Sequence, residues 1–288
     1  MSYWVVVVAR NAAQHISRTV NSLLQQTVKA ELVTIVDDGS TDETPRILGD
    51  YAQRISNLKV LTRPDLGYDI RRVPSNINLA TNFATRAGVK TEFFMISGDD
   101  CVYPPSYVEA LIERMHEKTR LVVASGKPSS GGNLSREHSP SGSGRIVASK
   151  FWGNVGGYPS KAGWETWLLY KAAEMGLETT LYDDVQFEHA RLRGAQHQFT
   201  YWGAAMGGLG YHPLYAVGRI AKNALSRPIG VKGAVNMLRG YLQSQLDSDD
   251  VFLSPFDGSL RQFVKNDQRC RIVRIVAATI GQNSDRMQ

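Results

Sequence analysis

Short apolar runs alternate with longer amphipathic stretches along the first two-thirds of this chain. Residues 3–9 form a continuous, largely β-branched run, and residues 32–36 and 93–96 form two more. Between the first two runs, apolar residues recur at helical spacing over residues 16–24. Continuous apolar runs of this length are typical of parallel strands buried on both faces. The pattern therefore predicts βαβ units and an α/β fold.

The same two periodicities predict the remaining elements of this region. They are strands at residues 58–61, 121–125 and 177–187, and helices from residue 43, over residues 79–89, over residues 106–117 and from residue 163. Residues 62–78 are predicted to be a polar loop. Residues 126–144 are dense in Gly, Ser and Pro, so we expect either a mobile loop beside a cleft or a simple connection.

Two adjacent carboxylates follow one of these apolar runs. Asp99 and Asp100 come directly after the strand predicted at residues 93–96 and the glycine Gly98. Ligands of open α/β sheets bind at the carboxyl ends of the strands. Two carboxylates there repel each other and lose hydration, which favours a divalent metal with oxygen ligands, Mg or Mn. The alternative is a surface turn capped by two solvated aspartates.

A second acidic pair follows the strand predicted at residues 32–36. Asp37 and Asp38 stand at its carboxyl end, Gly39 permits a tight turn, and residues 40–42 can cap the next helix. A carboxylate so placed can accept hydrogen bonds from a uracil or guanine ring or from ribose hydroxyls. A plain strand-to-helix turn is the alternative.

An ordered series of motifs connects these features. The motifs are Val-Val-Val-Val-Ala-Arg-Asn at 5–11, Ile-Val-Asp-Asp-Gly-Ser-Thr-Asp at 35–42, Asn82 before a small-residue helix, Thr-Glu-Phe-Phe-Met-Ile-Ser-Gly-Asp-Asp at 91–100 and Trp-Glu-Thr-Trp at 164–167. Together they resemble the family 2 glycosyltransferases over roughly residues 3–194. The resemblance implies the GT-A fold, a Rossmann-like mixed, mostly parallel sheet flanked by helices. It also implies an inverting transfer of a sugar from a nucleotide diphosphate donor to a hydroxyl acceptor, assisted by a divalent metal, Mn or Mg.

The resemblance also assigns the nucleotide site. It places Ala9, Asn11 and Asp38 along the nucleoside pocket, with Asp37 beside them. Independently of the resemblance, the polar loop contains Arg71 and Arg72, and we expect one or both either to contact the diphosphate or to be solvated surface arginines.

One departure from the family pattern concerns the metal. The family's Asp-x-Asp aligns with Ser97-Gly98-Asp99, so serine replaces the first acid and Asp99 keeps the metal-binding position. Losing one carboxylate weakens the link between ribose and metal, so we expect metal dependence to be looser than is usual in this family.

A glutamate outside these two pairs is the candidate general base. A glycosyl acceptor hydroxyl has a pKa far above neutrality, so it needs a base within hydrogen-bond reach. Glu165, in the first turn of a predicted helix, is our choice; family 2 enzymes usually carry Glu-Asp here, with the second acid as base, and this chain has Thr166 instead. The alternative role of Glu165 is to favour the helix N-terminus electrostatically.

The end of the last predicted strand adds a histidine and an arginine. His189 and Arg191 stand where related enzymes use His-x-Arg. The resemblance makes His189 a further contact to metal or diphosphate and Arg191 a cation that neutralises the leaving phosphate. A structural role is the alternative for each.

Composition indicates the type of protein, the charge of its partners and its compartment. A chain of 288 residues with 42% hydrophobic content is ordinary for a globular protein, and a net charge of +6 with a pI near 9.3 suits an anionic partner. Cys101 and Cys270 belong to no metal-binding spacing, which favours a reducing compartment. No signal-peptide pattern precedes the first strand, so we expect a cytoplasmic protein.

Basic residues dominate the chain beyond the predicted catalytic domain, which we assign to residues 1–194. Residues 190–246 contain seven Lys or Arg and no Asp or Glu, mixed with many aromatic and aliphatic residues. We therefore predict a basic amphipathic helical region at residues 195–288, with peripheral contact to the inner face of the membrane through residues 195–246. Packing on the catalytic domain or a dimer interface are the alternatives.

The expected acceptor and the alternatives to an enzyme follow from the same features of the sequence. A lipid-linked sugar or a growing surface polysaccharide is the expected acceptor, and an oligomer is compatible with the sequence. Because Ser97 and Thr166 replace family acids, a non-catalytic nucleotide-sugar-binding protein is the alternative to an enzyme. Nucleic-acid binding has no identifiable motif here and is not expected.

Overall fold

The computed structural model describes residues 1–129, 139–191, 199–226, 229–245 and 250–285. The chain forms two compact units, Met1–Ser160 with Met175–Arg193, and Lys161–Glu174 with Gly194–Gln288. The domain limits predicted from the sequence, 1–194 and 195–288, remain a prediction.

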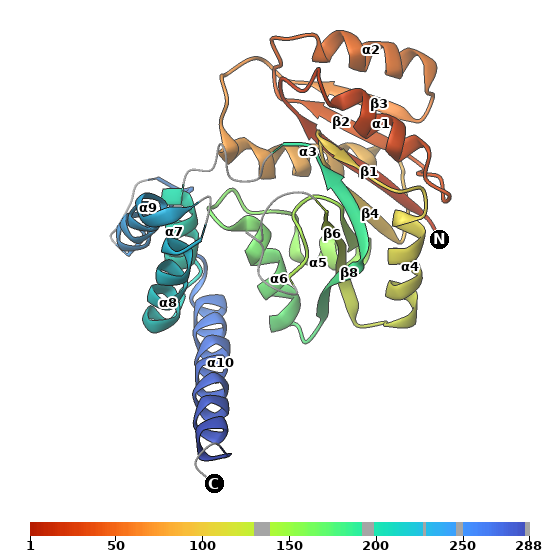
Figure 1. Cartoon of the computed structure of the whole chain (residues 1–288). Coiled ribbons are helices and arrows are strands. Elements are labelled where there is room, and N and C mark those ends of the chain that lie inside the picture. The colour runs from red at the N-terminus through yellow and green to blue at the C-terminus, as the bar shows by residue number, and fades with distance from the viewer. Residues whose placement is uncertain (130–138, 192–198, 227–228, 246–249, 286–288) are drawn as a thin grey trace. The chain divides into compact units, whose positions relative to one another are not determined.

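A mixed, mostly parallel sheet forms the centre of the first unit (Figure 1). Its strands are β1 Tyr3–Ala9, β2 Val33–Asp37, β3 Leu58–Thr62, β4 Phe93–Gly98, β5 Cys101–Val102, β6 Leu121–Pro128, β7 Arg145–Ala148 and β8 Glu178–His189. Their order is β3-β2-β1-β4-β7-β6-β8-β5. The first four run parallel, β7 is antiparallel to β4 and β6, β8 is parallel to β6, and β5 is antiparallel to β8. The predicted α/β class is confirmed.

Helices lie on both faces of this sheet because its strands are apolar on both sides. The helices of the first unit are α1 Ile16–Leu24, α2 Thr44–Arg54, the short 3₁₀ helix Ile70–Arg72, α3 Val73–Arg86, α4 Tyr107–Glu117 and α5 Ser149–Val155. Alternate residues of β1 point to opposite faces. Val5 and Val7 join a core with α1, α2 and α4, whereas Trp4 stacks on Phe94, which contacts Trp152 of α5.

The start of α3 corrects the sequence prediction. Residues 62–78 were expected to be a loop, but the helix begins at Val73. Pro74 occupies its first turn, where a proline's missing N–H costs nothing, and Asn76 and Ile77 are buried. Residues 73–78 therefore belong to a helix that packs inward.

Strand register positions the functional residues. β1 lies between β2 and β4, with Ala9 opposite Asp37 and Val8 opposite Gly98. Parallel strands end at the same edge of a sheet. The acids that follow β2 and β4 therefore lie on either side of the end of β1.

The second unit is helical. Its helices are α6 Trp164–Glu174, α7 Phe199–Gly208, α8 Pro213–Ala224, α9 Gly230–Gln243 and α10 Gly258–Asp285. The predicted C-terminal helical extension is confirmed by α7 to α10. Within the described ranges, none of these helices combines the length and apolar character that a membrane span requires.

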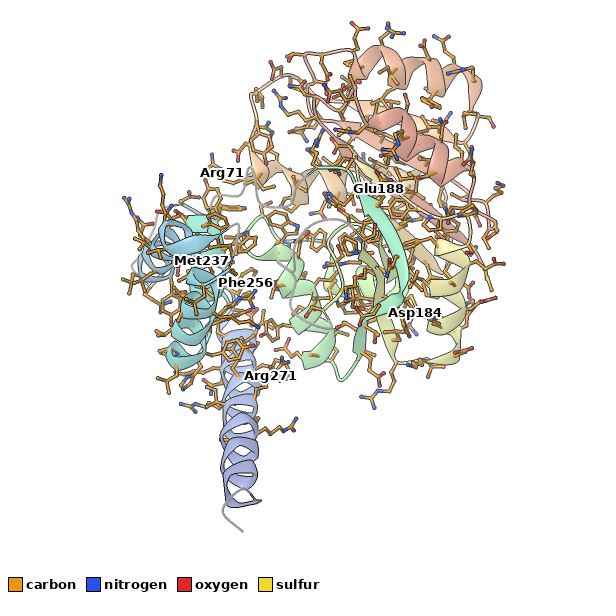
Figure 2. The ribbon with its side chains drawn as sticks, viewed as in Figure 1. Arg71, Asp184, Glu188, Met237, Phe256 and Arg271 are labelled. Carbon is orange, nitrogen blue, oxygen red and sulfur yellow. The ribbon has the colours of Figure 1, made fainter. Side chains whose placement is uncertain are left out.

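Glycines bring α7 and α9 into backbone contact. A Cβ placed on Gly203 would lie 1.8 Å from the Met237 carbonyl oxygen, and one on Gly240 would lie 1.9 Å from that of Thr200. Met237, labelled in Figure 2, is buried. A larger residue at either glycine has no room, so this contact fixes the rotation of α9 about its own axis.

Candidate active site

Four buried aspartates gather at the carboxyl edge of the first unit's sheet. Asp37 ends β2 and Asp38 follows it, while Asp99 and Asp100 follow β4. Each is at most 7% exposed. Because unpaired buried carboxylates are costly, each needs hydrogen-bond or cationic partners, and the structure provides them.

Asp38 is held by arginines from two segments. Arg72 Nη2 lies 3.0 Å from Asp38 Oδ2, and its Nε donates to both carboxylate oxygens at 3.2 Å. The guanidinium of Arg10 donates to the carbonyl oxygens of Asp38 and Gly39 and forms a 2.6 Å ion pair with Asp65. The predicted diphosphate ligand Arg72 thus neutralises Asp38 in this structure.

The ends of β1 and β2 are tied together through Asn11. This residue has a φ of 47°, its Oδ1 accepts a 2.8 Å hydrogen bond from Thr41 N, and its own N donates to Ser40 Oγ at 2.9 Å. Asp37 Oδ1 accepts from both the backbone N and the hydroxyl of Ser40. Asp37 Oδ2 accepts no hydrogen bond from any described residue.

Ala9 contributes backbone rather than side chain. It is fully buried, and its carbonyl oxygen accepts a 2.9 Å hydrogen bond from Asp38 N. Its predicted place beside the nucleoside remains a prediction.

Asp99 is held by a backbone amide from the start of the unit's sequence and by a guanidinium from its end. Its Oδ2 accepts a 3.1 Å hydrogen bond from Arg10 N, and its Oδ1 lies 2.8 Å from Arg191 Nη1. Arg191 also donates to the Asn11 carbonyl oxygen at 3.4 Å. Burial raises the pKa of Asp99 to about 6, although the guanidinium of Arg191 opposes this shift. The structure therefore brings together three predicted residues, Asn11, Asp99 and Arg191.

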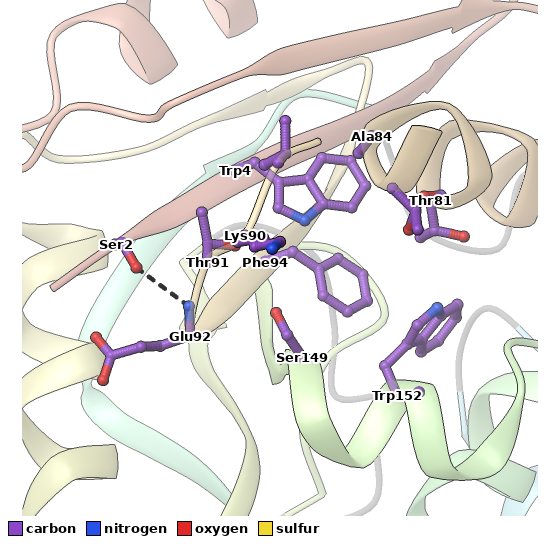
Figure 3. Close-up of a pocket in the computed structure, with 13 residues that line it drawn as sticks. Ser2, Trp4, Thr81, Ala84, Lys90, Thr91, Glu92, Phe94, Ser149 and Trp152 are labelled. Atoms are coloured by element: carbon purple, nitrogen blue, oxygen red, sulfur yellow. Dashed lines mark hydrogen bonds between the residues drawn. The ribbon is translucent and has the colours of Figure 1, made fainter. Parts of the chain in front are cut away.

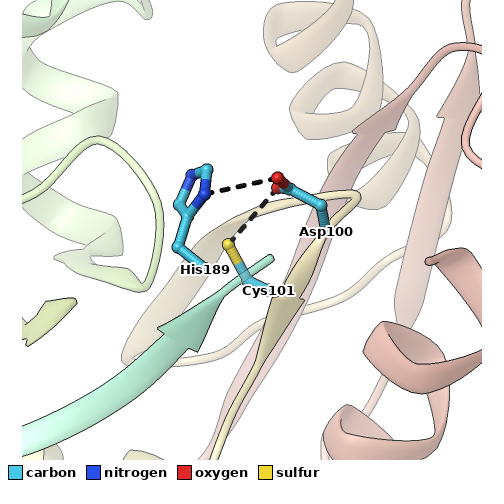
Figure 4. Close-up of side chains that lie close together, drawn as sticks. All are labelled: Asp100, Cys101 and His189. Atoms are coloured by element: carbon cyan, nitrogen blue, oxygen red, sulfur yellow. Dashed lines mark hydrogen bonds and ion pairs between the residues drawn. The ribbon is translucent and has the colours of Figure 1, made fainter. Parts of the chain in front are cut away.

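His189 pairs with Asp100 rather than Asp99 (Figure 4). His189 Nδ1 lies 3.3 Å from Asp100 Oδ2 and 3.1 Å from the Arg191 carbonyl oxygen, and Arg191 N donates to the same Asp100 oxygen at 3.1 Å. The pairing follows from the sheet, because β5 and β8 place Cys101 opposite His189. The thiol of Cys101 donates to Asp100 Oδ1 at 3.8 Å.

These residues fit a divalent metal. One ligand atom from each of Asp100, Cys101 and His189 lies within 4.8 Å of the others. Burial raises the pKa of the Cys101 thiol to about 12, so it stays protonated and is a poor ligand. A carboxylate with an imidazole suits Mn²⁺, and such ions commonly take their remaining ligands from substrate phosphates. Asp100 and His189 are therefore the best-placed ligands, while Asp99 as a ligand remains a prediction.

The serine that replaces a family acid is buried in a hydroxyl contact. Ser97 Oγ lies 2.9 Å from the Tyr103 hydroxyl and donates to the Gly98 carbonyl oxygen at 2.8 Å. The Ser97 hydroxyl therefore takes part in hydrogen bonds within its own segment, next to Asp99 and Asp100.

The predicted base, Glu165, lies elsewhere in the chain. It is exposed in the first turn of α6, and α6 belongs to the second unit. Its assignment as base remains a prediction.

Sequence reasoning missed Arg10 and Asp65, and it did not single out Asp100 as the partner of His189. Arg10 could have been found from the sequence, because it directly follows the strand predicted at residues 3–9. Asp65 lay in a segment without periodicity, so nothing in the pattern placed it beside Arg10.

A separate hollow of about 510 Å³ lies at the other end of the strands (Figure 3). Trp4, Phe94 and Trp152 line it together with Lys90 and Ser149. Trp4 and Phe94 stand near the starts of β1 and β4. This hollow is therefore distinct from the acidic edge, and nothing in it resembles the predicted chemistry.

A family model described as glycosyl transferase family 2 matches residues 4–171, more than half of the chain. The protein therefore belongs to this family and is a glycosyltransferase. The resemblance seen in the motifs is confirmed.

Curated relatives share part of this region. The chain is 29% identical over 119 residues to the chondroitin synthase of Pasteurella multocida (strain Pm70), which is 41% of this chain and 11% of that protein. It is 26% identical over 119 residues to the glycosyltransferase GlyG of Streptococcus pneumoniae serotype 4, which is 41% of this chain and 36% of that protein. The match therefore spans well under two-thirds of either relative.

Solved structures share the fold. The mannosyltransferase PcManGT from Pyrobaculum calidifontis, in complex with GDP-Man and Mn²⁺, has a TM-score of 0.60 at 16% identity over 86% of this chain and 88% of that one. S. aureus TarS 1–349 in complex with UDP-GlcNAc has a TM-score of 0.55 at 18% identity over 84% of this chain and 73% of that one. The predicted GT-A fold is confirmed.

Proposed function

We propose that the protein is an inverting glycosyltransferase of the hexosyltransferase type. It moves a sugar from a nucleotide diphosphate donor to a hydroxyl of a lipid-linked or surface-polysaccharide acceptor. The observation that carries the proposal is the convergence of Asp38, Asp99, Asp100 and His189 at one sheet edge of a family 2 domain. Donors of this class occupy the two solved neighbours PcManGT and TarS.

The nucleoside binds at the ends of β1 and β2 in this proposal. An ionised carboxylate offers about four acceptor positions, so Asp38 can accept from ribose or base while Arg72 holds it. Asn11 and the turn at Ser40 form the adjoining wall, fixed by their mutual hydrogen bonds. Arg10 keeps this wall in place through its bonds to Asp38, Gly39 and Asp65.

The diphosphate binds beside Asp99 and Asp100. Asp100 and His189, with Asp99 alongside, would hold a Mn²⁺ or Mg²⁺ ion there. Such an ion, when bound, stabilises the negative charge that develops on the leaving diphosphate. Arg191 supplies a second positive charge, since its guanidinium already pairs with Asp99 and can share a phosphate oxygen.

Glu165 acts as the general base. The acceptor oxygen attacks the anomeric carbon, and the bond from that carbon to the diphosphate oxygen breaks on the opposite side. The hydroxyl proton passes to the Glu165 carboxylate, and the nucleoside diphosphate leaves with the electron pair. One such displacement inverts the anomeric configuration.

The cellular location that we propose for the reaction is the one expected from the sequence. We propose cytoplasmic donor use, with the basic residues 195–246 bringing the enzyme to the inner face of a membrane that carries the acceptor. Nucleic acid has no part in this proposal.

A donor panel tests the function. UDP-GlcNAc, UDP-Glc and GDP-Man are each incubated with the protein in Mn²⁺ or EDTA, and released nucleoside diphosphate is measured. We expect slow donor hydrolysis with one donor, supported by Mn²⁺ and abolished in Asp99→Asn. A protein that binds a donor but turns over none in either form is a nucleotide-sugar-binding protein, the alternative to an enzyme.

A further inference from the structure

The helix α9 presents an apolar stripe to solvent. Val231, Val235, Leu238 and Leu242 are all exposed, from 41% for Leu238 to 70% for Val231. Their spacing of four, three and four residues places them on one face of the helix. Four large apolar side chains on one exposed face are more than isolated surface residues explain.

This stripe cannot turn inward. Gly233, Met237 and Gly240 are buried on another face of α9, and Gly240 touches the backbone of α7 at Thr200. Because that contact has no room for a Cβ, the rotation of α9 is fixed. The apolar stripe is therefore a stable surface feature of the second unit.

The neighbouring helix α8 adds further apolar residues. Leu214 and Val217 on α8 and Leu225 at its C-terminus are exposed, Leu225 by 92%. Asn223 Nδ2 donates to Met237 Sδ at 3.5 Å, so the two helices are in contact. We call the exposed apolar residues of the two helices the exposed apolar set: Leu214, Val217, Leu225, Val231, Val235, Leu238 and Leu242.

Cations accompany this set. Lys232 and Arg239, seven residues apart, project from one side of α9 next to the stripe, and Lys222 is exposed on α8. Within the described part of the chain these three form no ion pair with an acid. The sequence supplies no Asp or Glu from residue 190 to residue 246.

We propose that the exposed apolar set docks on an anionic lipid bilayer, with its side chains at the acyl boundary and Lys222, Lys232 and Arg239 at the level of the headgroups. Apolar residues flanked by unpaired cations have the chemistry that such a surface recognises. A second copy of this chain is a less suitable partner for this surface. If α8 and α9 of two copies met there, their cations would face one another, and neither copy would supply an acid from these helices. The inference rests on the membrane contact in the proposed function and deepens it by naming the residues that make the contact, but vesicle binding does not depend on sugar transfer.

Vesicle sedimentation of the full-length protein tests the inference. Vesicles of phosphatidylcholine alone are compared with vesicles rich in phosphatidylglycerol, for wild type and for Val235→Glu/Leu238→Glu. We expect wild type to sediment with the anionic vesicles and the double variant to bind at least about tenfold more weakly. Met175→Glu is the matched control, since Met175 is an exposed apolar residue of the first unit.

A charge variant separates the two contributions. Lys232→Glu/Arg239→Glu keeps the apolar stripe, so its binding to anionic vesicles should fall by about thirtyfold or more and lose its salt dependence. Circular dichroism melts verify that each variant folds. Donor hydrolysis is expected to be unchanged in all variants.

Three results would overturn the inference. The first is wild-type protein that stays in the supernatant with anionic vesicles. The second is equal sedimentation of wild type and of the Val235→Glu/Leu238→Glu variant. The third is light scattering that finds a dimer dissociated by this variant while vesicle binding is absent, which assigns the surface to a second copy. Each of these results removes the proposed membrane contact but leaves the donor assay, and so the proposed sugar transfer, standing.

Discussion

The two units of this protein differ in where they place charged and apolar side chains. The first unit buries acids and gives each a cationic or hydrogen-bonding partner, as in Asp38–Arg72, Asp99–Arg191 and Asp100–His189. The second unit leaves Lys222, Lys232 and Arg239 without an acidic partner among its described residues and leaves apolar residues exposed on α8 and α9.

The contrast separates two kinds of function. Burying a charge costs several kcal/mol unless it is compensated, so a cluster of compensated acids at a sheet edge indicates a site built for a charged ligand. Exposed apolar side chains on a rigid helix cost less and indicate a surface that a partner covers. Chemistry is therefore expected at the first unit's strand ends, and docking at the second unit's helices.

Glu165 is the residue that most directly challenges this division, because it is a proposed catalytic group on α6 of the second unit. Glu165→Gln should lower kcat for transfer by about 10²–10⁴-fold, the usual contribution of a general base, with donor affinity unchanged. Steady-state kinetics and donor titration measure the two effects. Glu174→Gln, at the end of the same helix, is the control. A Glu165 variant with wild-type kcat would confine the chemistry to the first unit.

The buried acid Asp99 should make the stability of the metal-free protein depend on pH. Its pKa of about 6 in the folded protein exceeds the ordinary value of 3.8. The folded state therefore binds more protons than the unfolded state between these values, and stability falls as pH rises through that window. Two pKa units correspond to about 3 kcal/mol.

Urea unfolding of wild type and Asp99→Asn in EDTA measures this effect from pH 4 to pH 7. Because asparagine does not ionise, the variant should gain stability relative to wild type as pH rises, by up to about 3 kcal/mol. A difference between the two proteins that is constant with pH would contradict the raised pKa of Asp99 and would show that Arg191 fully compensates the buried carboxylate.

Two glycines of the second unit should respond oppositely to the same substitution. Gly240→Ala places a Cβ against the Thr200 carbonyl oxygen and should destabilise the unit by about 1–3 kcal/mol. Gly218→Ala, on α8 where nothing lies within 4 Å, should stabilise it by about 0.5–1 kcal/mol. Hydrogen exchange, which resolves the helices separately, provides the measurement. Equal responses would show that close packing does not fix α9.

His189→Gln should weaken Mn²⁺ binding by at least about tenfold, because it removes the imidazole beside Asp100. His116→Gln is the control, since His116 is exposed and pairs with Glu92, which precedes β4 and so lies away from the carboxyl ends of the strands. Calorimetric titration with Mn²⁺ in the presence of a nucleoside diphosphate compares them. Equal affinities would remove His189 from the metal site.

The sequence predicted much of the first unit because its signals are local. The buried strands β1, β2 and β4 are uninterrupted apolar runs, and the acids directly follow two of them. Their convergence then follows from parallel topology alone. The short strands β5 and β7 were missed, because their pairing partners lie far away in sequence and supply their stability.

The finer geometry of the site depends on the same long-range contacts. His189 reaches Asp100 because β5 pairs with β8, and Arg10 reaches Asp65 across a segment without periodicity. Neither partnership has a signature in local pattern. In the second unit, composition predicted the basic amphipathic helices, but only the structure identified which face of α9 is exposed.

The most direct test of the acidic edge as the donor site is a crystal structure with Mn²⁺ and the nucleoside diphosphate of the preferred donor, in which anomalous scattering locates the ion. We predict a manganese peak within bonding distance of Asp100 or Asp99 and of His189, with the nucleoside between Asn11 and Asp38. A diphosphate bound away from the ends of β1, β2 and β4, or an ion coordinated by none of these residues, would contradict the account.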